Sequence, residues 1–191
     1  SRRHEIATIQ ELLQATLDSS QAMIQVFQAV RDDQGQIVDF IWVLNNRTSE
    51  QYYGNVIGQS LLTRNPGVAE EGIFETFKKV VETGTSDQSE RRYFHEQFQG
   101  WFYQSTVKLG DGVATHTLDI TKLKDAQAEL GRSQALLQSV MDSTLDIIQV
   151  FRAVPDESGK IVDFEWIMNN LKAVQQNGDV IGKSILKQNP G

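Results

Sequence analysis

An internal repeat constrains this chain more than any other feature of its sequence. Residues 12–67 align with residues 136–191 without a gap, and about half of the aligned positions are identical. The repeated unit is longer than the helical or strand repeats that build solenoid proteins, so it indicates two copies of one domain. The sequence therefore predicts one complete domain and the N-terminal half of a second.

The two ends of the chain fit this pattern. The sequence starts with Ser1 rather than Met and stops at Asn189-Pro190-Gly191, whereas the first copy continues past its own Asn65-Pro66-Gly67. We expect the chain to be a piece of a longer protein, cut where the second copy would continue.

Composition indicates a globular protein and narrows its partners. The 191 residues are 39% hydrophobic and 23% charged, which is enough apolar material for a packed core. A formal charge of -7 would repel a phosphate backbone, so we expect no nucleic-acid partner. The longest apolar run is far too short to span a bilayer, so we expect no membrane contact. Cysteine is absent, which is common in reducing compartments, and we expect a cytoplasmic protein.

Periodicity predicts an α+β domain. Apolar residues at three- and four-residue steps predict an N-terminal helix within residues 1–20 and a longer helix over 70–83. Between these helices, two β-rich runs flank a turn and are followed by short helical turns. Three more alternating runs follow the longer helix. The predicted strands cover residues 23–30, 37–44, 88–98, 101–109 and 113–120.

A further helix is predicted from about residue 122 to 141, after the last strand. Leu123, Leu130 and Leu137 recur every seven residues, which is typical of a coiled-coil seam. A mostly polar helix of this length is marginally stable alone in water. We therefore expect a homodimer that associates through its helices and domain surfaces.

The order of these elements and several short motifs resemble the PAS domain, a sensor module of bacterial signalling proteins. The resemblance covers nearly the whole chain. The motifs that carry it are residues 32–35 with Ile37-Val38-Asp39-Phe40, Asn45-Asn46, Val56-Ile57-Gly58, Val80-Val81-Glu82-Thr83-Gly84 and Leu118-Asp119-Ile120-Thr121.

The resemblance implies a PAS fold, a five-stranded antiparallel sheet with short helices on one face. It implies that the parent protein is a sensor and, by analogy with the family, a two-component sensor histidine kinase. It also divides the chain into an N-terminal signalling helix (1–20), a complete PAS domain (21–121), a coiled-coil linker helix (122–141) and a truncated second PAS repeat (142–191).

The last motif is similar to the Asp-Ile-Thr signature of the family, where the final strand passes into an output helix. Thr121 is a suitable N-cap, because its hydroxyl can accept from a free amide of the first helical turn. Asp119 places negative charge near the positive end of that helix. We expect Asp119 and Thr121 to form a signal-relay junction; the alternative is that they only start a helix.

The layout of the family places a group of mostly aromatic residues between the sheet and the helices. Aromatic walls with a few polar groups suit a small-molecule ligand, but they suit a structural core equally well. The sequence leaves both interpretations open. The candidate pocket residues are Trp42, Tyr52, Tyr53, Phe74, Phe77, Tyr93, Phe102 and Gln104.

The cysteine and histidine content of the chain limits which cofactors it could bind. The flavin light sensors and photoactive yellow proteins of the family use a cysteine, which this chain lacks. Haem-binding members offer a histidine from the long helix, but residues 70–83 contain none, and His95 and His116 fall on predicted strands. Haem and cysteine-linked chromophores are therefore disfavoured, and the identity of any cofactor is unknown.

The sequence displays no catalytic constellation and no metal-binding motif. His95-Glu96 begins like a zinc-protease motif, but Gln99 stands where the second histidine is needed. Gly110-Asp111-Gly112 begins like a dinucleotide-binding loop, but a strand follows it instead of a helix. We expect no enzyme activity from this chain; an enzyme adapted from the same fold would need a convergent polar cluster.

Two functions of different classes follow from these observations. In the first, a ligand or partner alters the sheet, and the change passes through Asp119 and Thr121 into the linker helix. In the second, the domain is a constitutive dimerisation or spacer module whose own side chains fill the pocket. In either case the half repeat at 142–191 would expose an apolar face, which we expect another chain or the first domain to cover.

Overall fold

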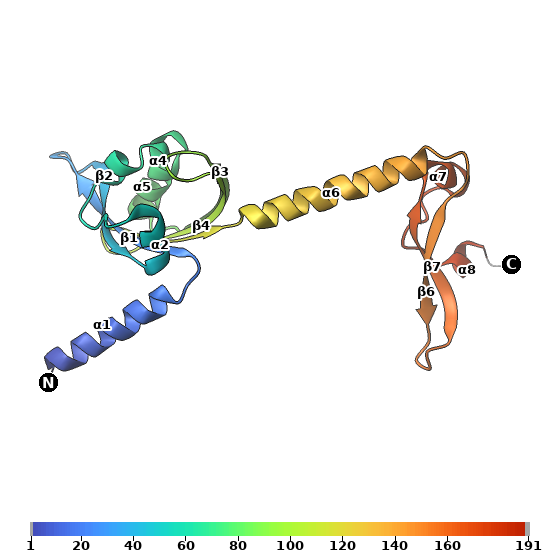
Figure 1. Cartoon of the computed structure of the whole chain (residues 1–191), viewed down its shortest axis with the longest axis horizontal. Helices are drawn as coiled ribbons and strands as arrows, with labels where there is room; N and C mark the ends of the chain where they lie inside the picture. The colour runs from blue at the N-terminus through green and yellow to red at the C-terminus, as the bar shows by residue number, and fades with distance from the viewer. Residues whose placement is uncertain (1, 190–191) are drawn as a thin grey trace. The chain divides into compact units, whose positions relative to one another are not determined.

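The computed structural model describes residues 2–189 (Figure 1). Ser1, Pro190 and Gly191 lie outside the described residues, and with them the first residue of the predicted N-terminal helix and the last two of the repeat. The chain divides into two compact units, Ser1–Lys124 and Asp125–Gly191.

The first unit is an α+β domain built on one antiparallel sheet, as predicted. The strand order in the sheet is β2-β1-β5-β4-β3. Helix α1 (Arg2–Asp18) precedes the sheet, and four short helices connect β2 to β3. The strands are β1 (Met23–Arg31), β2 (Ile37–Asn45), β3 (Asp87–Tyr93), β4 (Gly100–Lys108) and β5 (Gly112–Asp119). The connecting helices are α2 (Arg47–Tyr53), α3 (Leu61–Arg64), α4 (Gly67–Glu70) and α5 (Ile73–Thr83).

The core of this unit lies between one face of the sheet and the helices. Phe27 of β1 and Phe40 of β2 are 3% and 0% exposed. Both rings lie 5.6 Å from the ring of Phe77 on α5. Each aromatic side chain buried in this way stabilises the fold by about 1.5–3 kcal/mol, so α5 is held to the sheet mainly by apolar packing.

Two elements differ from the sequence prediction. The helix predicted over 70–83 is divided into α4 and α5, because Gly72 has a left-handed conformation with φ 74° and interrupts the helical path. The strand predicted over 88–98 ends at Tyr93, and residues 94–99 form a turn in which Glu96 has φ 48°. His95 therefore lies in this turn and not on a strand.

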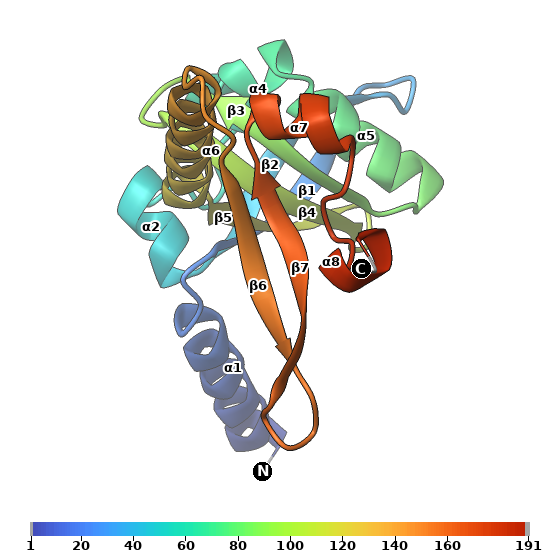
Figure 2. The same cartoon turned by 90° about the vertical axis from the view of Figure 1, so that its right-hand side faces the viewer.

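The second unit repeats the local structure of the first. Helix α6 (Thr121–Asp142) runs into it from the last strand of the first unit. Its two strands form an antiparallel hairpin (Figure 2). This hairpin pairs Phe151 with Trp166, just as the first hairpin pairs Phe27 with Trp42, and the same register shift precedes both pairs. The elements are β6 (Gln149–Pro155), β7 (Ile161–Asn169), α7 (Leu171–Asn177) and α8 (Ile185–Gln188).

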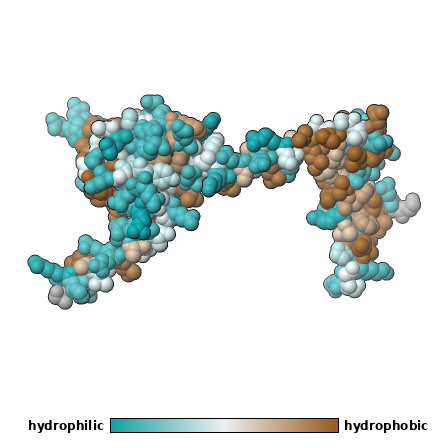
Figure 3. Space-filling model, viewed as in Figure 1, coloured by the Kyte–Doolittle hydropathy of each residue, from teal (hydrophilic) through white to brown (hydrophobic). Residues whose placement is uncertain are grey.

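The hairpin of the second unit exposes apolar side chains, as the sequence predicts. Phe164 is 42% exposed, whereas its equivalent Phe40 is 0% exposed. Ile161 is 55% exposed, whereas Ile37 is 3% exposed. Figure 3 shows this apolar surface in brown on the second unit. What covers it stays a prediction.

None of the helices within residues 2–189 combines the length and the apolar character needed to cross a bilayer.

Candidate functional site

The junction between β5 and α6 is formed by the first residues of the helix. The hydroxyl oxygen of Thr121 accepts a 3.0 Å hydrogen bond from the backbone N–H of Trp101 on β4. Asp119 accepts a 2.9 Å hydrogen bond from the backbone N–H of Thr121. The first helical hydrogen bond runs from the N–H of Lys124 to the carbonyl of Ile120. The predicted N-cap role of Thr121 is therefore corrected: its hydroxyl ties the helix to the sheet, and Asp119 caps the first amide.

Two further contacts support this junction. Gly100 leaves the space that Thr121 occupies, because a Cβ at residue 100 would lie 2.1 Å from the Thr121 hydroxyl oxygen. Lys124 forms an ion pair with Glu90 of β3, and its ammonium lies 5.4 Å from the ring centre of Trp101. These contacts were not predicted, because no local pattern in the sequence links Gly100 or Glu90 to the start of the helix.

Most of the predicted pocket residues lie in the core. Trp42 and Phe77 are almost fully buried, and Tyr53 packs against Trp42 with 5.3 Å between ring centres. Tyr52 departs from the prediction, because it is 41% exposed and stacks on the ring of Phe98. Phe74 is partly buried against the same core.

A cavity of about 50 Å³ lies within this core, lined by side chains of β1, β3, β4, β5 and α2 and of the turn after β3. It is far smaller than the roughly 300–1,000 Å³ of sites that enclose drug-sized ligands. Of the predicted residues, Tyr53, Tyr93, Phe102 and Gln104 line it. The lining also includes Met23, Arg91, Phe98 and Thr117, which were not predicted.

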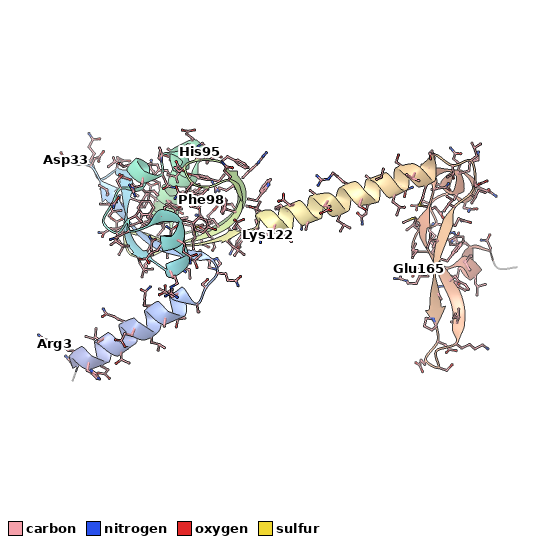
Figure 4. All side chains as sticks on the ribbon, in the orientation of Figure 1. Arg3, Asp33, His95, Phe98, Lys122 and Glu165 are labelled. Atoms are coloured by element: carbon pink, nitrogen blue, oxygen red, sulfur yellow. The ribbon has the colours of Figure 1, made fainter. Side chains whose placement is uncertain are left out.

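Two of the missed residues had no clear signal in the sequence. Phe98 lies in the turn formed by residues 94–99 (Figure 4), a stretch for which the sequence predicts a strand. Arg91 belongs to the mostly polar strand β3, in which alternate residues up to the buried Tyr93 face the helices. The alternation that ends at Tyr93 was the only available sign that Arg91 faces inward.

A polar cluster closes the side of the core next to α4. The hydroxyl of Tyr93 donates to Glu96 at 2.7 Å, and the same carboxylate accepts from the N–H of Gly67 at 2.8 Å. Burial, and secondarily Glu96, raises the pKa of Tyr93, so its phenol stays neutral. His95 lies 2.8 Å from Glu71, and this hydrogen bond raises the pKa of the imidazole. Across residues 2–189, no three or more His, Asp or Glu side chains are grouped so as to hold a metal ion.

No protein-family profile and no curated protein matches the chain. The PAS domain of Bordetella pertussis BvgS is a structural neighbour with 20% identity and a TM-score of 0.43, over 70% of this chain and 98% of that chain. An RNA-binding light-oxygen-voltage receptor has 16% identity and a TM-score of 0.42, over 70% of this chain and 39% of that chain. A sensory box sensor histidine kinase from Vibrio cholerae has 16% identity and a TM-score of 0.37, over 62% of this chain and 95% of that chain.

The arrangement of the sheet decides the fold. A five-stranded antiparallel sheet in the order β2-β1-β5-β4-β3, with α2 to α5 inserted after the first hairpin, is the architecture of PAS domains. The first unit has the PAS fold. The fold class expected from the sequence is thereby confirmed for this unit.

The helix that leaves the PAS sheet exposes its predicted seam. Leu123, Leu130 and Leu137 of α6 are 55%, 60% and 52% exposed. A row of leucines this exposed gains stability by packing on another helix. The coiled coil itself stays a prediction.

An asparagine latch holds each helix that enters a repeat. In the PAS unit, the Asn46 amide donates to the carbonyl of Leu17 near the end of α1, and its oxygen accepts from the N–H of Ser49 in α2. In the second unit, Asn170 donates equivalently to the carbonyl of Met141 near the end of α6 at 3.0 Å. The Asn45-Asn46 motif alone does not predict this latch, because the role of the side chain depends on residues far along the chain.

Proposed function

We propose that this chain is a signal-relay module of a cytoplasmic two-component sensor histidine kinase. In this proposal the chain itself carries no enzyme activity, and the kinase activity belongs to the rest of the parent protein. The module works as a homodimer through α6. The PAS fold of the first unit and the hydrogen bonds that join its sheet to the start of α6 support this proposal.

One structural relationship carries the relay. The ring of Phe102 lines the cavity, and its backbone pairs in the sheet with Asp119, which caps α6. Trp101, the neighbour of Phe102, holds the hydroxyl of Thr121. A shift of β4 caused by occupancy of the cavity would therefore act directly on the first turn of α6.

Both ends of α6 are fixed to folded structure. The first turn is bound by Trp101 and Asp119, and the last by Asn170, which holds the carbonyl of Met141. A helix held at both ends transmits a rotation or shift along its length instead of absorbing it by fraying. In a parallel dimer, two arrangements of the leucine seam would then form the switch.

Replacing the capping carboxylate tests this proposal. We expect Asp119→Ala in the full-length parent to abolish regulation of the output while the PAS unit keeps its circular dichroism spectrum and its melting temperature within a few degrees. Asp125→Ala is the matched control, because Asp125 lies on the exposed first part of the same helix. Unchanged regulation in Asp119→Ala would contradict the relay.

A second function, a constitutive dimerisation or spacer module, is favoured by one observation. The cavity holds only about 50 Å³, because aromatic side chains fill most of the space between sheet and helices. Native and denaturing mass spectrometry of the purified chain separate the two functions. Mass released on denaturation supports a ligand-binding sensor, whereas bare dimers that never take up a ligand support the spacer.

A further inference from the structure

The half-buried Arg91 lines the cavity of the PAS unit, and its charge is not matched by an acid. Arg91 donates through Nη1 to the carbonyl of Glu71 at 3.0 Å and through Nη2 to the hydroxyl of Ser89 at 2.8 Å. Neither acceptor is charged. Its Nε is buried and has no hydrogen-bond partner. Within residues 2–189, the guanidinium forms no ion pair with a carboxylate.

A buried donor of this kind is normally satisfied. Arginine is the side chain best suited to hold a carboxylate, because its planar fork presents parallel N–H groups. Since Arg91 is one of the residues that line the cavity, an anion in the cavity could take up both its free Nε–H and its charge.

A second donor lies on a neighbouring wall of the cavity. Gln104 on β4 donates to the hydroxyl oxygen of Thr117 on β5 at 2.9 Å. A hydroxyl that accepts one hydrogen bond still has its own proton to donate. Thr117 on β5 and Arg91 on β3 both line the cavity, from the two strands that flank β4.

The remaining walls are apolar and limit the size of a ligand. Met23, Phe98 and Phe102 contribute them. They suit a short hydrocarbon chain, whereas inorganic phosphate would leave these surfaces without a partner. A volume of about 50 Å³ admits only a few non-hydrogen atoms.

We propose that this cavity binds a short-chain monocarboxylate, with its carboxylate on Arg91 and Thr117 and its hydrocarbon chain against Phe98 and Phe102. This inference rests on the proposed sensory function and names its ligand class. The ligand would complete the hydrogen bonding of Arg91 and press on β4 next to Trp101, where the relay begins.

Calorimetric titration of the intact chain with sodium propionate tests the site, with propionamide and sodium phosphate at matched ionic strength as comparisons. For so small a ligand we expect saturable binding of propionate with a dissociation constant of about 1 mM. We expect binding of propionamide and of phosphate to be at least about tenfold weaker, because neither supplies both the charge and the hydrocarbon chain.

Two variants locate the site. Arg91→Gln should weaken propionate binding at least about tenfold, whereas Arg92→Gln should leave it unchanged, because Arg92 is exposed and lies over the ring of Phe94. Absence of saturable propionate binding, equal binding of propionamide, or an unchanged affinity in Arg91→Gln would overturn the proposal. If Arg91→Gln does not fold, the comparison of propionate with propionamide on the unaltered chain decides the question.

Amide exchange along α6 in the same samples separates this proposal from the relay. Propionate binding that leaves exchange at residues 121–128 unchanged would support the carboxylate site and contradict the relay. Absence of binding would overturn the carboxylate site alone, because the Asp119→Ala experiment tests the relay without any ligand.

Discussion

Phe102, whose ring lines the cavity of the PAS unit, is the β-sheet partner of Asp119, whose carboxylate caps the first amide of α6. The interior of the domain and the start of the linker helix are thus one residue pair apart. A change in the cavity can therefore reach α6 through the backbone of two neighbouring strands, with no need for a long chain of side-chain contacts.

Loss of the Thr121 hydroxyl should loosen the attachment of α6 to β4. Thr121→Val keeps the shape of the side chain but leaves the N–H of Trp101 without its acceptor. We expect hydrogen exchange at the Trp101 amide to rise about tenfold, which corresponds to roughly 1.4 kcal/mol of local stability. Thr121→Ser keeps the hydroxyl and serves as the control. Equal exchange in the two variants would show that this hydrogen bond does not fix the junction.

Gly100 should be intolerant of even one added methyl group. In Gly100→Ala the new Cβ would lie 2.1 Å from the Thr121 hydroxyl oxygen, so the junction must shift, and we expect a loss of about 1–3 kcal/mol in unfolding free energy. Adding Thr121→Ala should recover part of this loss by removing the hydroxyl. Urea unfolding measures the loss in Gly100→Ala and its recovery in the double variant, and amide exchange at Trp101 reports on the junction itself. Purely additive effects of the two substitutions would contradict a contact between Gly100 and Thr121.

Asn46 should be one of the most sensitive positions of the PAS unit. Its side chain makes four hydrogen bonds, to Leu17, Ala22, Ile24 and Ser49. We expect Asn46→Ala to cost on the order of 3 kcal/mol and to raise amide exchange in the last turn of α1. The exposed Asn55→Ala is the control. A similar loss in both variants would mean that the latch contributes little.

His95 should make the turn at 94–99 sensitive to pH. The hydrogen bond with Glu71 raises the pKa of His95 above its usual value, with smaller contributions from Glu70 and Glu96. The protonated imidazole therefore stabilises the fold fully below about pH 6.5, and this stability is lost as the pH rises through the folded-state pKa.

The proton NMR titration of His95 checks this pH dependence directly. We expect its pKa to lie above about 6.5 and to fall in Glu71→Gln. Thermal stability above this pH should depend less on pH in His95→Gln than in the unaltered chain. A pKa of His95 at or below that of an unstructured histidine would contradict the arrangement with Glu71.

The order of strands and helices and the two copies of the domain could be predicted from the sequence, because local periodicity and the internal repeat determine them. Alternation of apolar residues specified the strands, and Asp119-Ile120-Thr121 marked the point where the sheet passes into α6. What it could not predict depends on contacts between distant residues. The left-handed conformation of Gly72 split a helix whose apolar period continues without interruption.

The candidate site was predicted less completely than the fold. Tyr93, Phe102 and Gln104 line the cavity, and neighbouring positions on a short helix point in different directions, so Tyr53 lines it and Tyr52 does not. Arg91 was missed because a charged residue on a polar strand is typical of a solvent-exposed face. Its inward position shows in the sequence only as the alternation that ends at Tyr93, which is a weak signal on so polar a strand.

The arrangement of α6 is the central claim, and cysteine cross-linking tests it most directly. The chain has no cysteine of its own, so single-cysteine variants report on one position each. Leu130→Cys places the thiol on the predicted seam, and Arg132→Cys places it on the opposite side of the helix. We predict rapid disulfide-linked dimers for Leu130→Cys, slow ones for Arg132→Cys, and a clear change in the Leu130→Cys rate when Thr121→Val is added. Equal cross-linking rates at the two positions would contradict the account. So would a cross-linking rate of Leu130→Cys that stays the same when Thr121→Val is added, because the junction would then not control the seam.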